Sequence, residues 1–232
     1  MKWFEVRIVL LLTIAAMFNS ACDGDKVTPI FVDLTKTQLD ILFVSESEGQ
    51  QQIYAVKDST PGTVYNISKA YGGWGILDPS WSADGRKFAY TDLIVVTSSY
   101  APFHTNIYIR NMDMDSSRYD SLNLRKITTD PYILDTSGVA YGTLNLRPDW
   151  NSTTQKIVFI SDRIDNKFNI FRIDVTDSLT GDSNSITQLT AEDDKIDIYC
   201  YPAFSPNGST IVYSSSKDGS EEIWKMNADG SN

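Results

Sequence analysis

Side chains suited to catalysis are few in this chain of 232 residues. His104, in the segment A-P-F-H-T-N, is the single histidine, so neither an H-E-x-x-H pair nor a multi-histidine zinc site can form. The sequence contains no G-x-S-x-G element to present a nucleophilic serine and no phosphate-binding P-loop. We therefore expect His104 to be an exposed loop residue, and we expect a protein that is not an enzyme and uses no cofactor.

Two acidic segments raise the question of a calcium site. One contains Asp113, Asp115 and Asp120, and the other contains Asp193, Asp194 and Asp197. Neither has the glycine at the sixth position or the glutamate at the twelfth that an EF-hand loop uses. We interpret both segments as solvated loop charge and expect no bound metal.

The two cysteines lie in different surroundings. Cys22 follows an apolar segment, 8–18, which is preceded by Lys2 and Arg7 and is too short to be a good membrane span. Such a segment is typical of an export signal. Cys200 lies in I-D-I-Y-C-Y-P, where we expect a small buried hydrophobic residue. A Cys22–Cys200 disulfide is the alternative.

The residues Asn19-Ser20-Ala21-Cys22 resemble the lipobox of bacterial lipoproteins, although that family prefers an aliphatic residue at the position of Asn19. The resemblance implies a signal peptide over 1–21, lipidation of Cys22 and a tether over 22–38. The membrane would then be contacted only through this N-terminal lipid. An ordinary cleaved signal and an uncleaved anchor remain alternatives.

The charge of the chain bears on its partners. There are 20 basic and 30 acidic residues, which gives a net charge of −10. Because nucleic acids and anionic membranes attract basic surfaces, this balance argues against both as partners. It is typical of an exported domain that charge keeps soluble.

After residue 39 the chain repeats a pattern of apolar runs and turns. An isoleucine followed by an aromatic residue recurs, and each of its first three copies is followed by an apolar residue and a hydroxyl residue. A turn-flanked aromatic residue precedes its last three copies. The isoleucine pairs are Ile53-Tyr54, Ile107-Tyr108, Ile170-Phe171 and Ile223-Trp224; the hydroxyl residues are Ser68, Thr128 and Thr190; the turn-flanked aromatics are Trp81, Trp150 and Phe204.

Each repeat therefore supplies up to four strands in a fixed order. A four-stranded meander cannot bury both of its faces alone, whereas copies that stack around an axis bury them against each other. We expect the turn-flanked aromatic residues to pack between adjacent sheets. The extra length of the repeats falls in loops that we assign to 93–105, 112–124 and 176–184.

The segments P-S-W-S-A-D-G-R-K-F-A-Y and P-A-F-S-P-N-G-S-T-I-V-Y-S-S-S-K-D-G-S-E-E-I-W-K-M-N-A-D-G-S-N resemble the WD40-like repeats of TolB-type propellers. The resemblance implies an all-β fold, a β-propeller of four-stranded antiparallel blades. About four blades are present, over 39–69, 78–129, 146–191 and 201–232 of the domain 39–232. We interpret them as a fragment of a six-bladed ring. The alternative is a closed four-bladed ring completed by Pro29–Leu34.

Two groups of residues have predicted roles in the repeats. Tight turns that need positive φ are expected at the dipeptides Asp84-Gly85, Asn207-Gly208 and Asp229-Gly230. The connectors between blades should all cross one face near the central channel, and they carry aromatic residues suited to a protein or glycan partner. These aromatic residues are Tyr71, Trp74, Tyr132, Tyr141, Tyr199 and Tyr201. The alternative is that their rings only seal one blade against the next.

Three functional hypotheses follow. The resemblance to TolB implies a non-catalytic, lipid-anchored protein of the bacterial cell envelope, periplasmic or surface-exposed, whose propeller is a scaffold for other envelope proteins. A second hypothesis is the propeller domain of a prolyl-oligopeptidase-like peptidase whose catalytic domain lies beyond this chain. A third is a surface glycan-binding protein. Propeller repeats occur in many unrelated roles, so the site must decide among these.

Overall fold

The computed structural model describes residues 40–47, 50–68, 75–95, 103–112, 124–128, 133–134, 140–151, 153–175 and 186–231. Within these ranges the chain is all-β, as predicted, with a single turn of 3-10 helix, η3 (Glu192–Asp194). No helix in the described ranges has the length and apolar character needed to cross a membrane. The predicted signal peptide, Cys22 and the tether lie outside the described residues, as does Pro29–Leu34.

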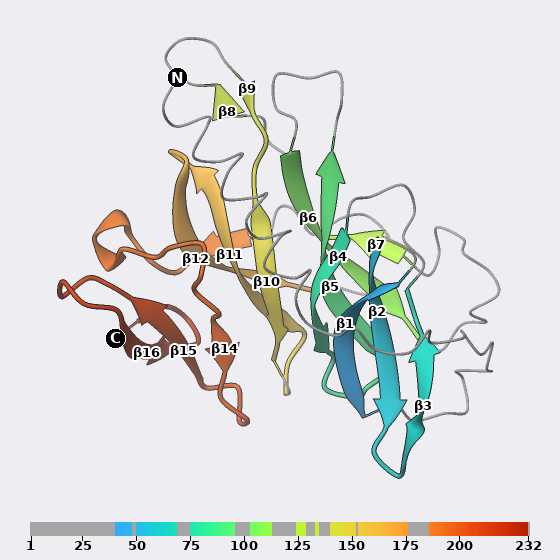
Figure 1. The fold of residues 1–232 in the computed structure, drawn as a ribbon. Coiled ribbons are helices and arrows are strands. Elements are labelled where there is room, and N and C mark those ends of the chain that lie inside the picture. Colours follow the sequence, from blue (N-terminus) through green and yellow to red (C-terminus); the bar gives the residue numbers. More distant parts are fainter. Residues whose placement is uncertain are drawn as a thin grey trace.

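The strands form four successive antiparallel units, which fan across the molecule in chain order (Figure 1). The first unit is β1 (Ile41–Ser47), β2 (Gln50–Lys57) and β3 (Thr60–Asn66). The second is β4 (Gly75–Trp81), β5 (Lys87–Val95), β6 (Phe103–Asn111) and β7 (Leu124–Lys126). The third is β10 (Asn145–Trp150), β11 (Lys156–Ile164), β12 (Lys167–Asp174) and β13 (Ile186–Gln188). The fourth is β14 (Ala203–Phe204), β15 (Thr210–Ser215) and β16 (Glu222–Asn227).

Two details complete the topology. A single parallel pair, Gln51↔Gly75, joins β2 to β4, so the first two units share one sheet of seven strands. A small hairpin of β8 (Ile133–Leu134) and β9 (Ala140–Tyr141) lies between the second and third units in the sequence. Among the described residues, no strand pairing joins β16 back to β1.

The recurring hydroxyl residues bind the outer strand of a unit to its neighbour. The hydroxyl oxygen of Ser68 accepts a hydrogen bond from the backbone N–H of Ile53 at 2.6 Å. Thr128 does the same for Ile107 at 2.9 Å, and Thr190 for Ile170 at 2.8 Å. In each case the side chain gives a hydrogen-bond acceptor to a buried backbone N–H group. Without it, that group would be cut off from water and left without a hydrogen bond. This explains why a hydroxyl residue recurs in phase with the isoleucine.

The hydrophobic core lies between adjacent units, because each strand has apolar residues on both faces. Ala89 and Ile107 of the second unit pack with Phe159, Phe171 and other residues of the third unit. A second cluster joins the third unit to the fourth through residues that include Val158, Ile170, Ile211, Tyr213 and Met226. A third joins the first unit to the second through residues that include Ile53, Ala55, Phe88 and Tyr90. Trp81, Trp150 and Phe204 all belong to or pack against these clusters.

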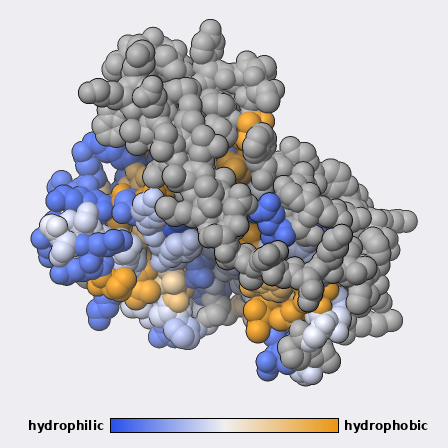
Figure 2. Space-filling view, in the orientation of Figure 1, coloured by the Kyte–Doolittle hydropathy of each residue, from blue (hydrophilic) through white to orange (hydrophobic). Residues whose placement is uncertain are grey.

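The fourth unit is buried on one face only. Tyr213 and Met226 face the third unit and are 2% and 3% exposed. Val212 and Ile223, which alternate with them along β15 and β16, are 41% and 77% exposed. The space-filling view shows apolar surface over this part of the molecule, at its lower left (Figure 2).

The tight turns at Gly85 and Gly208 link the first and second long strands of their units. Gly85 has φ +65° and Gly208 has φ +69°, a region that residues with a Cβ rarely occupy. The N–H of Gly85 donates to the carbonyl of Ser82 at 2.9 Å, and that of Gly208 to the carbonyl of Ser205 at 2.7 Å. In the third unit, where the dipeptide is absent, the Asn151 side chain organises the turn by accepting from the N–H of Thr153 at 2.8 Å.

The predictions for 93–105 and His104 were wrong. Strands β5 and β6 extend into that segment with the pairs Leu93↔Thr105, Ile94↔His104 and Val95↔Phe103. His104 therefore lies in a strand, and only 7% of it is exposed. The physical reason is that 93–95 is a run of aliphatic residues, two of them β-branched, which continue the ladder beyond the expected loop boundary.

Candidate functional site on the inner strands

Three polar residues occupy the same position in successive units. Asp78, Arg147 and Tyr201 each stand directly before a proline. Asp78 and Arg147 lie in β4 and β10, and Tyr201 lies just before β14; these are the first strands of their units, which we call the inner strands. Strand β10 contacts both β4 and β14. The repeat therefore brings three side chains from distant parts of the sequence to one place.

The backbone at two of these positions is unusual. Asp78 has φ +52° and Arg147 has φ +57°. The strand pairing shifts register between Leu77 and Ser80 and again between Leu146 and Asp149, so both residues lie in irregular segments. A non-glycine residue at positive φ costs on the order of 1–3 kcal/mol, and such residues cluster at functional sites. Because the same strained conformation occurs at the same position in two neighbouring units, we interpret this position as a candidate functional site.

The Arg147 guanidinium is the centre of the cluster. Its carbon atom Cζ lies 3.7 Å from the ring centre of Tyr201 and 6.0 Å from that of Tyr199. Its Nη1 donates to the carbonyl oxygen of Cys200 at 3.3 Å. Tyr199 is 48% exposed and Tyr201 is 56% exposed. A cation stacked on one ring and close to a second holds both exposed tyrosines against the inner strands.

Asp78 completes the cluster from the second unit. Its Oδ2 accepts from the hydroxyl of Thr91 at 3.3 Å, and the Thr91 hydroxyl in turn accepts from the N–H of Arg147 at 3.2 Å. Burial raises the pKa of Asp78, and the charge of Arg147 together with these hydrogen bonds only partly opposes that rise. Burial also raises the pKa of Tyr201, with a further contribution from Asp78.

Asp149 ties the three inner strands together beside this cluster. Its Oδ2 accepts from the N–H of Phe204 at 2.8 Å, and its Oδ1 accepts from the hydroxyl of Ser80 at 3.4 Å. The Ser80 hydroxyl also accepts from the N–H of Trp150 at 3.0 Å. Burial raises the pKa of Asp149, while the two hydrogen bonds that it accepts lower it. This carboxyl group is a structural link between the second, third and fourth units.

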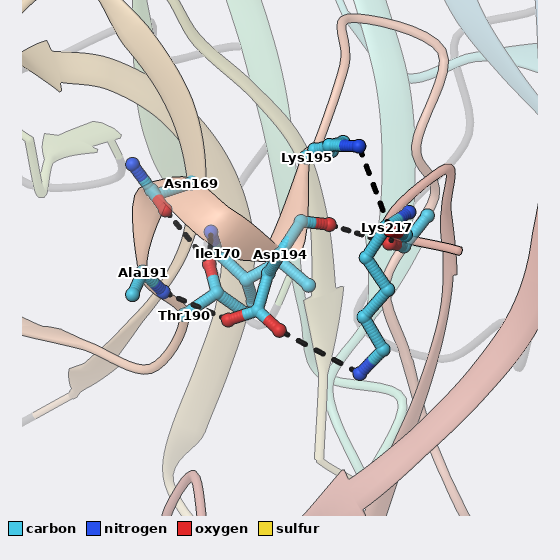
Figure 3. A network of polar contacts seen from close by, with 8 residues as sticks. Asn169, Ile170, Thr190, Ala191, Asp194, Lys195 and Lys217 are labelled. Carbon is cyan, nitrogen blue, oxygen red and sulfur yellow. Dashed lines mark hydrogen bonds and ion pairs between the residues drawn. The ribbon is translucent and has the colours of Figure 1, made fainter. Parts of the chain in front are cut away.

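The segment that carries the two tyrosines is anchored at its start by a polar network (Figure 3). The carboxylate of Asp194 accepts from the N–H of Ala191 at 2.9 Å and lies 3.7 Å from Nζ of Lys217. The ammonium group of Lys195 donates to the carbonyl of Lys217 at 3.5 Å. The network fastens the connector after β13 to the fourth unit, and so limits the freedom of the tyrosines that follow.

The second acidic segment serves the fold. Asp194 belongs to the network above, and the carboxylate of Asp197 accepts from the N–H of Tyr199 at 2.7 Å. Among the described residues, no group of three or more His, Cys, Asp or Glu side chains is placed to hold a metal ion. The first acidic segment, 113–120, lies outside the described residues.

The structure brings two of the six predicted binding aromatics together, Tyr199 and Tyr201. Tyr141 lies in strand β9, which pairs with β8 in a two-stranded sheet of its own. Tyr71, Trp74 and Tyr132 lie outside the described residues. Cys200, named above for its carbonyl, is a buried free cysteine.

Asp78 and Arg147 were missed by the sequence reasoning. Alignment of the segments D-P-S-W, R-P-D-W and Y-P-A-F would have placed Asp78, Arg147 and Tyr201 at one repeat position. A charged or polar residue before the proline of each repeat was the signal that could have identified Asp78 and Arg147.

No model of a protein family matches the chain, and no curated protein sequence matches it. Solved structures do. TolB from Agrobacterium tumefaciens is 22% identical with a TM-score of 0.55, and the match covers 82% of this chain and 58% of that one. Hydrazine synthase from Kuenenia stuttgartiensis is 9% identical with a TM-score of 0.51, over 80% and 55% of the two chains. TolB from Acinetobacter baumannii is 20% identical with a TM-score of 0.40, over 82% and 49%.

The chain thus spans between about half and three fifths of the length of these structures. At such identities the likeness concerns the fold alone. Together with the four stacked antiparallel units and the cores between them, it shows that this chain folds as a TolB-like β-propeller.

Proposed function

We propose that this chain is a non-catalytic, lipid-anchored protein of the bacterial cell envelope whose propeller binds another envelope protein through Tyr199, Tyr201 and Arg147. The observation that carries the proposal is the pair of half-exposed tyrosine rings held by one guanidinium. Tyrosine and arginine are the residue types that concentrate binding energy at protein interfaces. Rings that are already fixed lose little side-chain entropy when a partner covers them.

The envelope location and the anchor rest on the N-terminal sequence. An export segment that ends in small residues and Cys22 resembles a lipobox, and the acidic net charge of −10 suits an exported domain. The resemblance of the repeats to TolB-type propellers, whose family role is contact with envelope proteins, supports the same assignment. Labelling with a clickable fatty acid should mark the wild-type protein, and label that persists in Cys22→Ala would rule out this anchor.

The binding role is tested by site-specific photo-crosslinking in the living bacterium. A photoreactive phenylalanine analogue at Tyr199 should give one discrete adduct with an envelope protein, because that ring is exposed at the proposed interface. The same analogue at Ile41, which lies in β1 of the first unit and is 50% exposed, is the matched control and should give no adduct of that mass.

The proposal predicts that Tyr201→Ala removes the adduct formed from position 199. An adduct that is equally strong in Tyr201→Ala, or that forms equally from position 41, would refute binding at this surface. A glycan array with the same variants tests the hypothesis of a glycan-binding protein. Saturable glycan binding that is lost in Tyr201→Ala would indicate that the ligand is a sugar and not a protein.

A further inference from the structure

Arg147 keeps unused hydrogen-bonding capacity. Its guanidinium carries five N–H donors, yet Nη1 is its only nitrogen with a hydrogen bond in the part of the protein that the structure describes. The residue is also only partly buried. The guanidinium of this partly exposed residue therefore still has donors to offer.

The positive charge of Arg147 is also incompletely matched. No carboxylate of the described residues lies within ion-pair distance, 4.0 Å, of this guanidinium. Asp78 acts on it only at longer range, through a charge interaction that opposes part of the rise in pKa that burial causes in that carboxyl group. The cluster therefore presents a cation with no close anion, on a protein whose other charge is mainly acidic.

The guanidinium is held in place before any ligand arrives. The Tyr201 ring supports one face of it at 3.7 Å, and the Cys200 carbonyl holds one end at 3.3 Å. The backbone of the same residue is fixed at φ +57° and donates to Thr91 at 3.2 Å. An arginine fixed in this way offers its planar fork of donors to a carboxylate with little further loss of side-chain freedom.

We infer that Arg147 is the receptor for a carboxylate group on the bound partner, either an aspartate or glutamate side chain or the carboxylate at the partner's C-terminus, with Tyr199 and Tyr201 flanking it. This inference rests on the proposed function, because it names the chemical group that the same surface recognises. A lysine at this position would keep the charge but would lose both the fork and most of the stacking.

The test uses a small probe that needs no knowledge of the partner. The Nε–Hε signal of Arg147 is followed by NMR in the full-length protein during titration with N-acetylglutamate, and in parallel with N-acetylglutamine, its uncharged amide. We expect saturable shifts with the acid, with a dissociation constant of about 1–10 mM for a single ion pair of this kind. We expect no saturable shift with the amide.

The variants separate recognition from structure. In Arg147→Lys the ring signals of Tyr201 should respond to the acid at least about 5-fold more weakly, and in Arg147→Gln they should not respond. If Arg147→Gln does not fold, the comparison of acid with amide on the wild-type protein still decides. Equal responses to both probes, or none to the acid, would overturn the inference. Arg147 would then have only the structural role of linking neighbouring units.

The outcome can be told apart from failure of the proposed function. A discrete cross-link at Tyr199 that persists in 50 mM N-acetylglutamate and in Arg147→Gln would support the protein-binding surface and refute only the recognition of a carboxylate. Binding of the probe to Arg147 without any cross-link would support the carboxylate site and refute the protein partner.

Discussion

The third and fourth units carry nearly the same strand motifs, yet their residues are buried very differently. Ile170 of β12 is 0% exposed, whereas Ile223 at the same position of β16 is 77% exposed. Val158 of β11 is 0% exposed, whereas its counterpart Val212 in β15 is 41% exposed. The comparison shows that the repeat motif determines which side of a strand is apolar and leaves open whether anything covers that side.

The difference follows from what each face packs against. Val158 and Ile170 face the fourth unit and form a common cluster with Ile211 and Tyr213. Val212 and Ile223 lie on the opposite face of the fourth unit, where the described residues provide no further sheet. Burial of an aliphatic side chain is worth about 1.5–3 kcal/mol, so the same residue type contributes to stability in one unit and little in the other.

The largest effect is expected from truncating the paired isoleucines. Ile170→Ala should lower the free energy of unfolding by about 2–5 kcal/mol, because it leaves a cavity in a closed core. Ile223→Ala should change it by less than about 0.5 kcal/mol, because the side chain is already in water. Urea unfolding of both variants measures the contrast. Equal losses would mean that Ile223 is covered in solution, and would abolish the distinction between the units.

A smaller effect should separate two glycine turns. Alanine at Gly85 or Gly208 is strained by positive φ, at roughly 1–2 kcal/mol. At Gly85 a Cβ would meet nothing within 4 Å, whereas at Gly208 it would clash with the Asn151 amide and lie 2.6 Å from the Thr153 hydroxyl. Asn151 also donates to the Gly208 carbonyl at 3.1 Å, a bond between the third and fourth units that the new methyl group would disturb.

We therefore expect Gly208→Ala to cost about 1 kcal/mol more than Gly85→Ala, the net worth of a typical hydrogen bond. Thermal unfolding of the two variants under one set of conditions measures the difference. Identical melting temperatures would show that the Asn151 side chain moves aside without loss, and that the third and fourth units are coupled mainly through their apolar core.

The smallest expected effect concerns a position that differs between the second and third units. Asp92 in β5 corresponds to Ser161 in β11. Burial raises the pKa of Asp92 to about 6, although the charge of Lys126 lowers it somewhat. Because the folded state holds this proton more tightly than the unfolded state does, the contribution of Asp92 to stability is greatest below about pH 4 and is lost as the pH rises through about 6.

Asp92→Asn should remove that part of the pH dependence, so its advantage over the wild type should grow between pH 4 and pH 7. Asp92 is partly exposed, and water weakens the effect. Urea unfolding at several pH values measures it, with Asp193→Asn as a control on an exposed carboxylate. Parallel curves for wild type and Asp92→Asn would show that the carboxyl group ionises as freely in the folded protein as in the unfolded state.

Much of the local structure could be predicted from the sequence. The isoleucine–aromatic pairs fall in β2, β6, β12 and β16, and the Asp-Gly and Asn-Gly dipeptides stand at turns, because both signals depend on residues close together in the sequence. The end of the loop at 93–105 was misjudged, since strand length depends on the partner strand as much as on the segment itself.

The candidate site was predicted only in part. Tyr199 and Tyr201 were named from their place in a connector, but Arg147 and Asp78 were not, because neither lies in a known catalytic motif and neither is aromatic. What unites them is a repeat position in three different units. Their contacts, including the 3.7 Å approach of Arg147 to Tyr201, exist only once those units are stacked.

The sequence by itself determined the all-β class, the phase of the repeats, the turns and the apolar side of each strand, since all of these follow from alternation and turn chemistry over a few residues. Only the tertiary structure decided that Ile170 is covered and Ile223 is not, that His104 is buried, and that Asp78, Arg147 and Tyr201 meet. Those outcomes depend on which surface a unit packs against, and the sequence pattern of one unit does not specify the neighbouring unit.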